Sequence, residues 1–302
     1  MPRRYTLILN PAAGRGRARA YLPRLEAALE LSGLDAELVV SEGPGDPVRL
    51  AREAAARGRA LVACGGDGLV GSVAAIAAEA GVEFGIVPLG AGNDFARHLG
   101  LDVSQPLAAL EVLDGGVTAE VDLGRVNGRL YCCVAGTGFD AEANRWANNV
   151  ARLTGTPLYV AAVLRTLARY RPQPFRITAD GTTREVEAWL IAVANGPSYG
   201  GGMLVAPEAR TDDALLQVVI IGAISRLDFL RTFPKVFDGS HVHHPAVEVY
   251  AARRVELAAP RAALPLEIYA DGERVGPLPA EIEVVPRALK ARVPRGAPAP
   301  PA

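Results

Sequence analysis

The sequence is poor in lysine: of its 32 basic residues only Lys235 and Lys290 are lysine, and the rest are arginine. A lysine is required in the GxxxxGK[ST] phosphate loop and in the third strand of protein kinases, so both sites are excluded. The basic residues are balanced by 33 acidic ones, which leaves a net charge of −1. This balance gives no sign of a nucleic-acid surface, and we expect no nucleic-acid partner.

Cysteines and long apolar runs are scarce as well. The three cysteines, Cys64, Cys132 and Cys133, form no CxxC pair, and an odd number that includes an adjacent pair makes a poor disulfide framework. This usage favours a reducing cytoplasm. No apolar run reaches the roughly 18 residues of a membrane span, and the N-terminus lacks the apolar core of a signal peptide. We therefore expect a protein that is soluble, or at most peripheral to a membrane.

Half of the 302 residues are hydrophobic, which is enough for a large core and predicts one large or two ordinary domains. Up to about residue 122, short β-branched runs alternate with helical patterns, as in a parallel sheet built from βαβ units. The expected strands are Tyr5–Leu9, Ala36–Val40, Ala60–Cys64 and Phe84–Val87, and the expected helices are Arg17–Leu31, Pro47–Arg57 and Leu69–Ala80. In such sheets ligands bind at the carboxyl ends of the strands.

From about residue 123 to residue 286 the pattern changes to alternating runs separated by tight turns. Three Asp-Gly or Asn-Gly pairs, which begin at Asn127, Asp180 and Asp271, predict type I′ hairpins. This part is predicted to be a mainly antiparallel domain, with helical insertions near Pro157–Tyr170 and Ser225–Phe233. Residues 287–295 are expected to complete the first domain. The proline-rich tail, residues 296–302, is predicted to be disordered.

Three loops after predicted strands could carry chemistry. Residues 10–17 form a glycine-containing turn that leads into a helix, which exposes backbone N–H groups of the kind that bind phosphate. Residues 64–69 read Cys-Gly-Gly-Asp-Gly-Leu, so a backbone can approach a ligand closely while Asp67 presents one carboxylate. Residues 88–97 form another glycine loop, with an amide and a carboxylate at Asn93 and Asp94. Two such loops at neighbouring strand ends favour a nucleotide site over ordinary turns.

These motifs resemble one known family. The run Gly65-Gly66-Asp67-Gly68, followed about 20 residues later by Pro88-Leu89-Gly90-x-Gly92-Asn93-Asp94-Phe95-Ala96-Arg97, is similar to the diacylglycerol kinase catalytic domain of bacterial lipid kinases. Sphingosine kinases belong to the same family, and NAD kinases are related to it. The likeness continues in order through Gly136–Asp140, Asn195–Met203, Thr211–Asp213 and Asp271–Glu273, and so spans nearly the whole chain.

The resemblance implies a Rossmann-like or phosphofructokinase-like α/β domain, a C-terminal β-sandwich domain and an active site in the cleft between them. It implies ATP and Mg²⁺ as cofactors. The residues expected to line the nucleotide are Asn10, Pro11, Ala12, Ala13, Gly14, Ser41, Gly65, Gly66, Asp67, Gly68, Leu69, Val70, Gly71, Ala91, Asn93 and Asp94. A structural Mg²⁺ would be held by main-chain oxygens of Arg210 and Leu215 and by the Asp213 carboxylate.

The implied catalytic residues are Asp271, Glu273 and Asp67. Phosphoryl transfer to an alcohol needs positioning, neutralisation of charge and an acceptor for the hydroxyl proton, and Asp271 or Glu273 could be that acceptor. The substrate would be the hydroxyl of diacylglycerol or a similar lipid at the inner face of the membrane. A soluble-substrate kinase like the NAD kinases is the first alternative. Homodimer formation is also left open.

Two departures from the family pattern motivate a second alternative. The family usually has threonine where this chain has Leu69, and a threonine or serine where it has Ala91. Each change removes a hydroxyl from a loop that should face phosphates, and a lost hydrogen bond to a charged group costs about 1.5–3 kcal/mol. A nucleotide- or lipid-binding protein with weakened catalysis therefore stays open. Glycine also commonly follows Asp213 in the family, where this chain has Ala214.

Other motifs are weaker. Gly196-Pro197-Ser198-Tyr199-Gly200 matches the GxSxG elbow of hydrolases, but that elbow must turn directly into a helix, which the glycines and Pro207 disfavour. The histidines at 241, 243 and 244 are expected on a polar loop rather than at a zinc site. The segment Leu153–Tyr170 interleaves arginines with leucines. It is predicted to face the core with a solvated arginine face, or alternatively to lie on an anionic leaflet.

Overall fold

The computed structural model describes residues 3–43, 45–139, 141–142, 165–262 and 265–296. The predicted insertion Pro157–Tyr170 lies outside these residues up to position 164, and its remaining residues 165–169 are helical. Residues 297–302 of the predicted disordered tail, and most of the segment Leu153–Tyr170, also lie outside the described residues.

The first part of the chain is a parallel α/β layer. Strands β1 (Tyr5–Leu9), β2 (Ala36–Val40), β3 (Ala60–Gly65) and β4 (Glu83–Pro88) are ordered β2-β1-β3-β4. They alternate with helices α1 (Arg17–Ser32), α2 (Asp46–Ala56) and α3 (Asp67–Ala80), and α4 (Asp94–His98) and α5 (Ala108–Gly115) follow, with a short 3₁₀ turn η1 (Ala13–Gly16) before α1. Because helices cover both faces, β1 and β3 are buried along their whole length. All four predicted strands and all three predicted helices are confirmed, with ends shifted by two residues or fewer.

The second part is antiparallel. Its strands are β5 (Val117–Val126), β6 (Arg129–Tyr131), β7 (Val134–Gly138), β8 (Gln173–Ala179), β9 (Thr182–Ala194), β10 (Leu216–Gly222), β11 (Val247–Ala252), β12 (Arg254–Ala258), β13 (Glu267–Ala270), β14 (Glu273–Pro277) and β15 (Ala280–Val293). Helix α8 (Arg226–Thr232) and the 3₁₀ turns η2 (Phe233–Phe237) and η3 (Ser240–His243) lie between β10 and β11. The long strand β9 pairs with β8 through its first half and with β7 and β10 through its second. Side chains such as Ile191, Val218, Val255 and Ile268 fill a dry core between the strands.

The predicted hairpins form where the Asn-Gly and Asp-Gly pairs stand. Asn127, Asp180 and Asp271 have φ of 48°, 45° and 48°, and the glycine after each has φ of 82° to 85°. Both central residues are therefore left-handed, as a type I′ turn requires. The turns join β5 to β6, β8 to β9 and β13 to β14.

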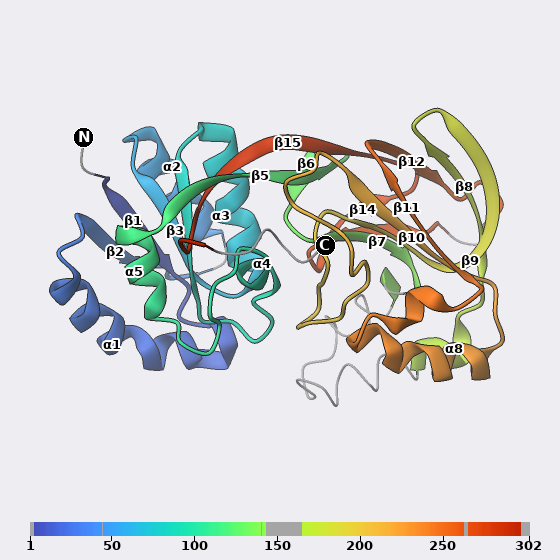
Figure 1. The fold of residues 1–302 in the computed structure, drawn as a ribbon, viewed down its shortest axis with the longest axis horizontal. Helices are drawn as coiled ribbons and strands as arrows, with labels where there is room; N and C mark the ends of the chain where they lie inside the picture. The colour runs from blue at the N-terminus through green and yellow to red at the C-terminus, as the bar shows by residue number, and fades with distance from the viewer. Residues whose placement is uncertain (1–2, 44, 140, 143–164, 263–264, 297–302) are drawn as a thin grey trace.

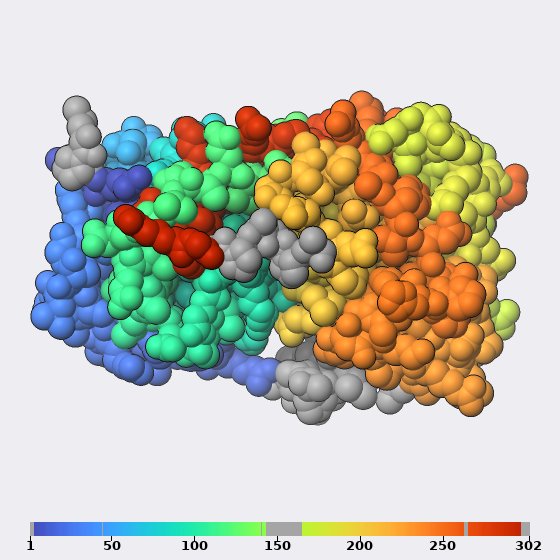
Figure 2. Space-filling model, in the orientation of Figure 1, coloured from blue at the N-terminus to red at the C-terminus, as the bar shows by residue number. Residues whose placement is uncertain are grey.

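Two long strands link the two lobes. Figure 1 shows β5 and β15 crossing from the α/β layer to the antiparallel layer. They pair along almost their whole length, with a bulge between Val285 and Leu289. Beyond the bulge, Lys290 and Ala291 pair in parallel with β4, whereas the start of β15 pairs with β12. One continuous sheet therefore runs through both lobes, which lie against each other in the space-filling view (Figure 2).

Candidate active site

Two glycine loops of the first lobe pack backbone against backbone. A Cβ on Gly90 would lie 2.3 Å from the Cα of Gly66, and a Cβ on Gly66 would lie 3.1 Å from the Cα of Gly90. Neither position has room for a side chain. Gly66, one of the glycines predicted to line the nucleotide, is thus required together with Gly90 by the fit between the loops after β3 and β4.

Asp67 fastens these two loops together. Its carboxylate accepts hydrogen bonds from the backbone N–H groups of Asn93 and Asp94, each at 2.8 Å. Burial raises the pKa of Asp67 and the nearby Asp94 charge raises it further, whereas the backbone donors act in the opposite direction. The carboxylate is therefore directed at the N-terminus of α4, where a negative charge is favoured. Its predicted catalytic role stays a prediction.

Asn93 and Asp94 also bind protein groups. The Asn93 amide accepts from the N–H of Gly90 and donates to its carbonyl. Asp94 is 2% exposed and reaches across to the second lobe, where it accepts hydrogen bonds from the backbone N–H groups of Gly201 and Gly202 at 2.6 and 2.8 Å. The glycine run of the second lobe is thereby fixed to α4, a long-range pairing that the sequence did not indicate.

The nucleotide-binding residues predicted from the sequence divide into two groups. A cavity of about 760 Å³ lies at the carboxyl ends of β1 and β2 and beside the N-terminus of α3. Its lining consists of Asn10, Pro11, Ala12, Gly16, Arg19, Ser41, Glu42, Gly43, Gly45, Pro47, Val48, Gly68, Leu69, Ser72 and Glu273. The predicted Ala13, Gly14, Gly65, Gly66, Asp67, Val70, Gly71, Ala91, Asn93 and Asp94 are not part of that lining. Arg19, in the first turn of α1, was missed by the sequence analysis although it is the cationic side chain of this lining.

The Asp271 hairpin closes the far side of the site. Both oxygens of Asp271 accept hydrogen bonds from backbone N–H groups, those of Cys132, Cys133 and Val134, at 2.6 to 3.2 Å. Burial raises the pKa of the Asp271 carboxyl, and the three backbone donors oppose this shift. The hairpin is therefore anchored to the chain just before β7 by its own acidic side chain.

Glu273 joins two cavities. It lines the large cavity and also a smaller one of about 170 Å³ between α3 and the hairpin, to which Asp67, Gly71, Arg129 and Asp271 contribute. A Glu273 carboxylate oxygen lies 3.9 Å from where a Cβ on Gly68 would stand. The structure thus brings the predicted catalytic residues Asp67, Asp271 and Glu273 around one small acidic space that adjoins the large cavity.

Asp122 is a candidate functional residue that the sequence analysis missed. It is 2% exposed, and its carboxylate accepts hydrogen bonds from the N–H groups of Ala214 and Arg287, both at 2.7 Å. It therefore ties the predicted metal-binding turn to the bulge of β15. An acid between two apolar residues of a strand, Val121 and Leu123, was the signal available in the sequence, because a buried carboxylate needs specific partners.

The turn from Arg210 to Leu215 is the predicted Mg²⁺ site. Burial raises the pKa of Asp213, and the charges of Asp122 and Asp212 raise it further, whereas the N–H of Leu215 opposes this shift by donating to the Asp213 carboxylate at 3.0 Å. A cation at this turn would offset the repulsion between the carboxylates. Carboxylate and carbonyl oxygens suit Mg²⁺, and the residues present fit it in this respect. Within the described ranges, no group of three or more His, Cys, Asp or Glu residues is arranged to hold a metal. Arg210 itself pairs with Asp212 through its guanidinium group.

The structure also shows why glycine is usual after Asp213. Ala214 has φ of 59°, a left-handed conformation that costs an L-residue with a Cβ roughly 1–2 kcal/mol. The other two departures from the family pattern are Leu69 and Ala91. Leu69 is buried, packs against Gly65 and lines the large cavity, whereas Ala91 is exposed on its loop.

The GxSxG match does not form a hydrolase site. The Ser198 hydroxyl lies 3.0 Å from Nε2 of His98 and 3.1 Å from Asp94, but the acid contacts the serine rather than the histidine. Burial lowers the pKa of His98 to about 4. After Ser198 the chain makes a tight pairing between Tyr199 and Met203, with no helix. A triad needs its acid on the histidine and its serine at a strand-to-helix turn, so this reading is excluded.

Comparison with known proteins agrees with this architecture. Residues 4–126 match the family model "Diacylglycerol kinase catalytic domain", and residues 133–293 match "YegS C-terminal NAD kinase beta sandwich-like domain". A diacylglycerol kinase of Mycobacterium tuberculosis is 38% identical over 96% of this chain and 95% of its own, and a Pseudomonas aeruginosa protein named "Probable lipid kinase YegS-like" is 32% identical over 90% and 89%. A crystal structure of a Bacillus anthracis diacylglycerol kinase has the same fold, with a TM-score of 0.74 at 20% identity over 99% and 98% of the two chains.

These matches confirm the predicted fold class, an α/β domain followed by a β-sandwich domain, and the resemblance from which it was inferred. No helix in the described part of the chain is long and apolar enough to span a membrane. Relatives at 38% and 32% identity that align over nine-tenths of the chain or more place it in one family. The protein is a member of the diacylglycerol kinase family of lipid kinases.

Proposed function

We propose that this protein transfers the γ-phosphate of ATP to the hydroxyl of diacylglycerol or a similar lipid. One observation carries the proposal: Glu273, from the second lobe, lines the same cavity as Gly68 at the N-terminus of α3 and as the Asn10–Ala12 turn. A nucleotide in this cavity would have its phosphates between the N-termini of α1 and α3 on one side and the acidic pair Asp271 and Glu273 on the other. Phosphoryl transfer to an alcohol needs this arrangement.

The phosphates would be bound without lysine. The loops before α1 and α3 offer backbone N–H groups at the positive ends of two helices, and Arg19 lies in the same lining. Mg²⁺, when bound with the nucleotide, supplies neutralisation of the charge on the transferred group. Glu273 and Asp67, which line the small cavity beside Asp271, are the carboxylates that such an ion would meet.

We assign Asp271 as the acceptor of the hydroxyl proton. Its position is fixed by three backbone donors, and its raised pKa makes the ionised form a stronger base than an ordinary aspartate. When the lipid oxygen forms its bond to the γ-phosphorus, the bond to the ADP oxygen breaks and the hydroxyl proton passes to Asp271. Glu273 lines both cavities and would face the transferred group of a nucleotide bound in the larger one.

The lipid would be reached from a membrane surface, since no helix in the described residues is long and apolar enough to span a membrane. We propose that the enzyme acts as a peripheral protein at the inner face of the membrane. Its cysteines, Cys64, Cys132 and Cys133, are free and buried, which suits a reducing compartment. The substrate assignment follows the names of the relatives, which are diacylglycerol and lipid kinases.

The test is transfer of labelled phosphate from ATP with Mg²⁺ to dioctanoylglycerol in detergent micelles, with NAD as a soluble competitor acceptor. Label in the chloroform-soluble product, and none in NAD, is the expected result. Label in NAD alone would show a soluble-substrate kinase, and label in neither, with ATP still bound, would show a binding protein. In that last case the double variant Leu69→Thr, Ala91→Thr distinguishes weak catalysis, which it should raise, from a different function.

A further inference from the structure

The second lobe carries an apolar surface with a basic border, which we call the α8 face. It consists of Leu227, Leu230, Phe237, Arg226, Arg231 and Lys235, all on α8 and η2 and all exposed. The three apolar side chains are 57%, 41% and 53% exposed. Single exposed apolar residues are normal on a protein surface, but three within eleven positions, on α8 and the 3₁₀ turn η2 that directly follows it, are a local concentration that a partner could cover.

The opposite side of α8 is already fully packed. Phe229 is buried, and its ring lies 4.8 Å from those of Phe139 and Trp189. Leu227 and Leu230, three positions apart, share the other side of the helix. Since Phe229 and Thr232 are the buried residues of α8, the exposed leucines are not needed to hold the helix in place.

The charges on and around the α8 face favour an anionic partner. Arg226, Arg231 and Lys235 alternate with the apolar residues and outnumber the two acids of the segment, Asp228, which lies 3.4 Å from Nε2 of His244, and Asp238, which accepts hydrogen bonds from Ser240. Lysine is otherwise almost absent from this protein, and one of its two lysines is here. Arginine and lysine beside leucine and phenylalanine are the composition of segments that lie in a membrane interface.

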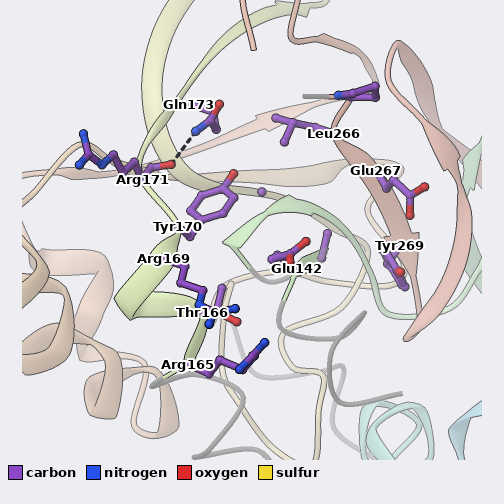
Figure 3. Close-up of a pocket in the computed structure, with 13 residues that line it drawn as sticks. Glu142, Arg165, Thr166, Arg169, Tyr170, Arg171, Gln173, Leu266, Glu267 and Tyr269 are labelled. Carbon is purple, nitrogen blue, oxygen red and sulfur yellow. Dashed lines mark hydrogen bonds between the residues drawn. The ribbon is translucent and has the colours of Figure 1, made fainter. Parts of the chain in front are cut away.

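The α8 face adjoins a second basic region. The guanidinium of Arg226 donates to the carbonyl of Tyr170 at 3.4 Å. Tyr170 belongs to a pocket of about 700 Å³ whose lining includes Arg165 and Arg169. Figure 3 shows Arg165, Arg169 and Tyr170 along one side of this pocket, with Glu267 and Tyr269 across it. The basic border thus continues from α8 to the rim of a pocket in the lipid-substrate lobe.

We propose that the α8 face docks the enzyme on an anionic lipid bilayer, with Leu227, Leu230 and Phe237 inserted below the headgroups and Arg226, Arg231 and Lys235 bound to lipid phosphates. This inference rests on the proposed function for its purpose, but the docking can be measured without catalysis. Each cation near an anionic surface contributes about a fivefold gain in partitioning, so three together contribute on the order of a hundredfold.

The test is sedimentation of the whole protein with vesicles of equal parts phosphatidylglycerol and phosphatidylcholine, and with phosphatidylcholine alone. The variant Leu227→Ser, Leu230→Ser, Phe237→Ser should lose at least tenfold in binding. The variant Arg226→Gln, Arg231→Gln, Lys235→Gln should lose the preference for phosphatidylglycerol. Leu31→Ser, which changes an 89% exposed leucine of α1 in the first lobe, is the matched control and should bind as the unchanged protein does.

Several results would overturn the proposal. The first is unchanged vesicle binding by the triple serine variant, and the second is an equal loss of vesicle binding in the Leu31→Ser control. The third is a dimer of the unchanged protein that becomes a monomer in the triple serine variant, measured by sedimentation velocity, which would assign the face to a second copy of the chain. Loss of the serine variant's activity on dioctanoylglycerol in micelles would assign it to catalysis. If the unchanged protein binds vesicles but phosphorylates no lipid, the proposed function fails and the docking surface stands.

Discussion

Two hairpins with the same Asp-Gly turn show what the local sequence determines and what the surroundings of the turn determine. Asp180 and Asp271 have nearly equal φ, and each binds backbone N–H groups of a neighbouring strand end with its carboxylate. Asp180 is exposed and receives the N–H groups of Arg253 and Arg254. Asp271 is half-buried and lines a cavity with Asp67 and Glu273. The turn follows from the dipeptide, whereas the chemistry follows from what the turn faces.

The largest effect is expected from Asp271→Asn. Loss of the proton acceptor should lower kcat by about 10²- to 10⁴-fold while ATP binding, measured by titration calorimetry, changes little. The paired variant Asp180→Asn should keep kcat within twofold, because its hairpin adjoins neither cavity of the candidate site. Equal losses in the two variants would show that both carboxylates act only by holding their turns.

Glu273→Gln should have the next largest effect. Glu273 stands two residues after Asp271 and faces Gly68, whereas Thr182 stands in the same place after Asp180 and is exposed. Removing the Glu273 charge should lower kcat/KM for ATP with Mg²⁺ about 10- to 100-fold, and the loss should vary with Mg²⁺ concentration if Glu273 meets the ion. Thr182→Ala is the control. A loss that is independent of Mg²⁺ would contradict this role.

The change in the free energy of unfolding with pH should also distinguish Asp271 from Asp180. The pKa of Asp271 is raised in the folded protein, so the folded state holds this proton over a pH range where the unfolded chain has released it. Stability should therefore fall as the pH rises from the ordinary aspartate range through the raised value, and Asp67 and Asp213 add in the same direction. Urea unfolding across this range should show a shallower fall for Asp271→Asn than for Asp180→Asn; equal slopes would contradict it.

The smallest effect is expected at a third left-handed position. Asp180 and Asp271 stabilise their turns with side-chain hydrogen bonds, but Ala214 adopts φ of 59° with only a methyl group. Ala214→Gly relieves this strain and should stabilise the protein by up to about 1 kcal/mol, since the greater freedom of unfolded glycine offsets part of the gain. The midpoint of thermal unfolding measures the effect, and a lower midpoint would contradict it.

The sequence predicted those features that depend on neighbours in the chain. Strand and helix periodicity, and the three turns, were confirmed because each is specified within a few residues. The hydrogen bonds from Asp94 to Gly201 and Gly202, and those from Asp122 to Ala214 and Arg287, join segments about 90 to 165 residues apart, and no local pattern encodes them. The domain limits and the roles of the site residues stay predictions, because the same glycines and acids serve both packing and ligand binding.

The ribbon of β5 and β15 has a consequence for how the chain folds during synthesis. Strand β4 pairs with β3 on one side. On its other side it pairs with Lys290 and Ala291 of β15, which lie near the end of the chain. Until these residues leave the ribosome, β4 is an open edge that another chain could pair with. The first lobe is thus made first but completed last, and its folding should be slow because its closing contact spans most of the sequence.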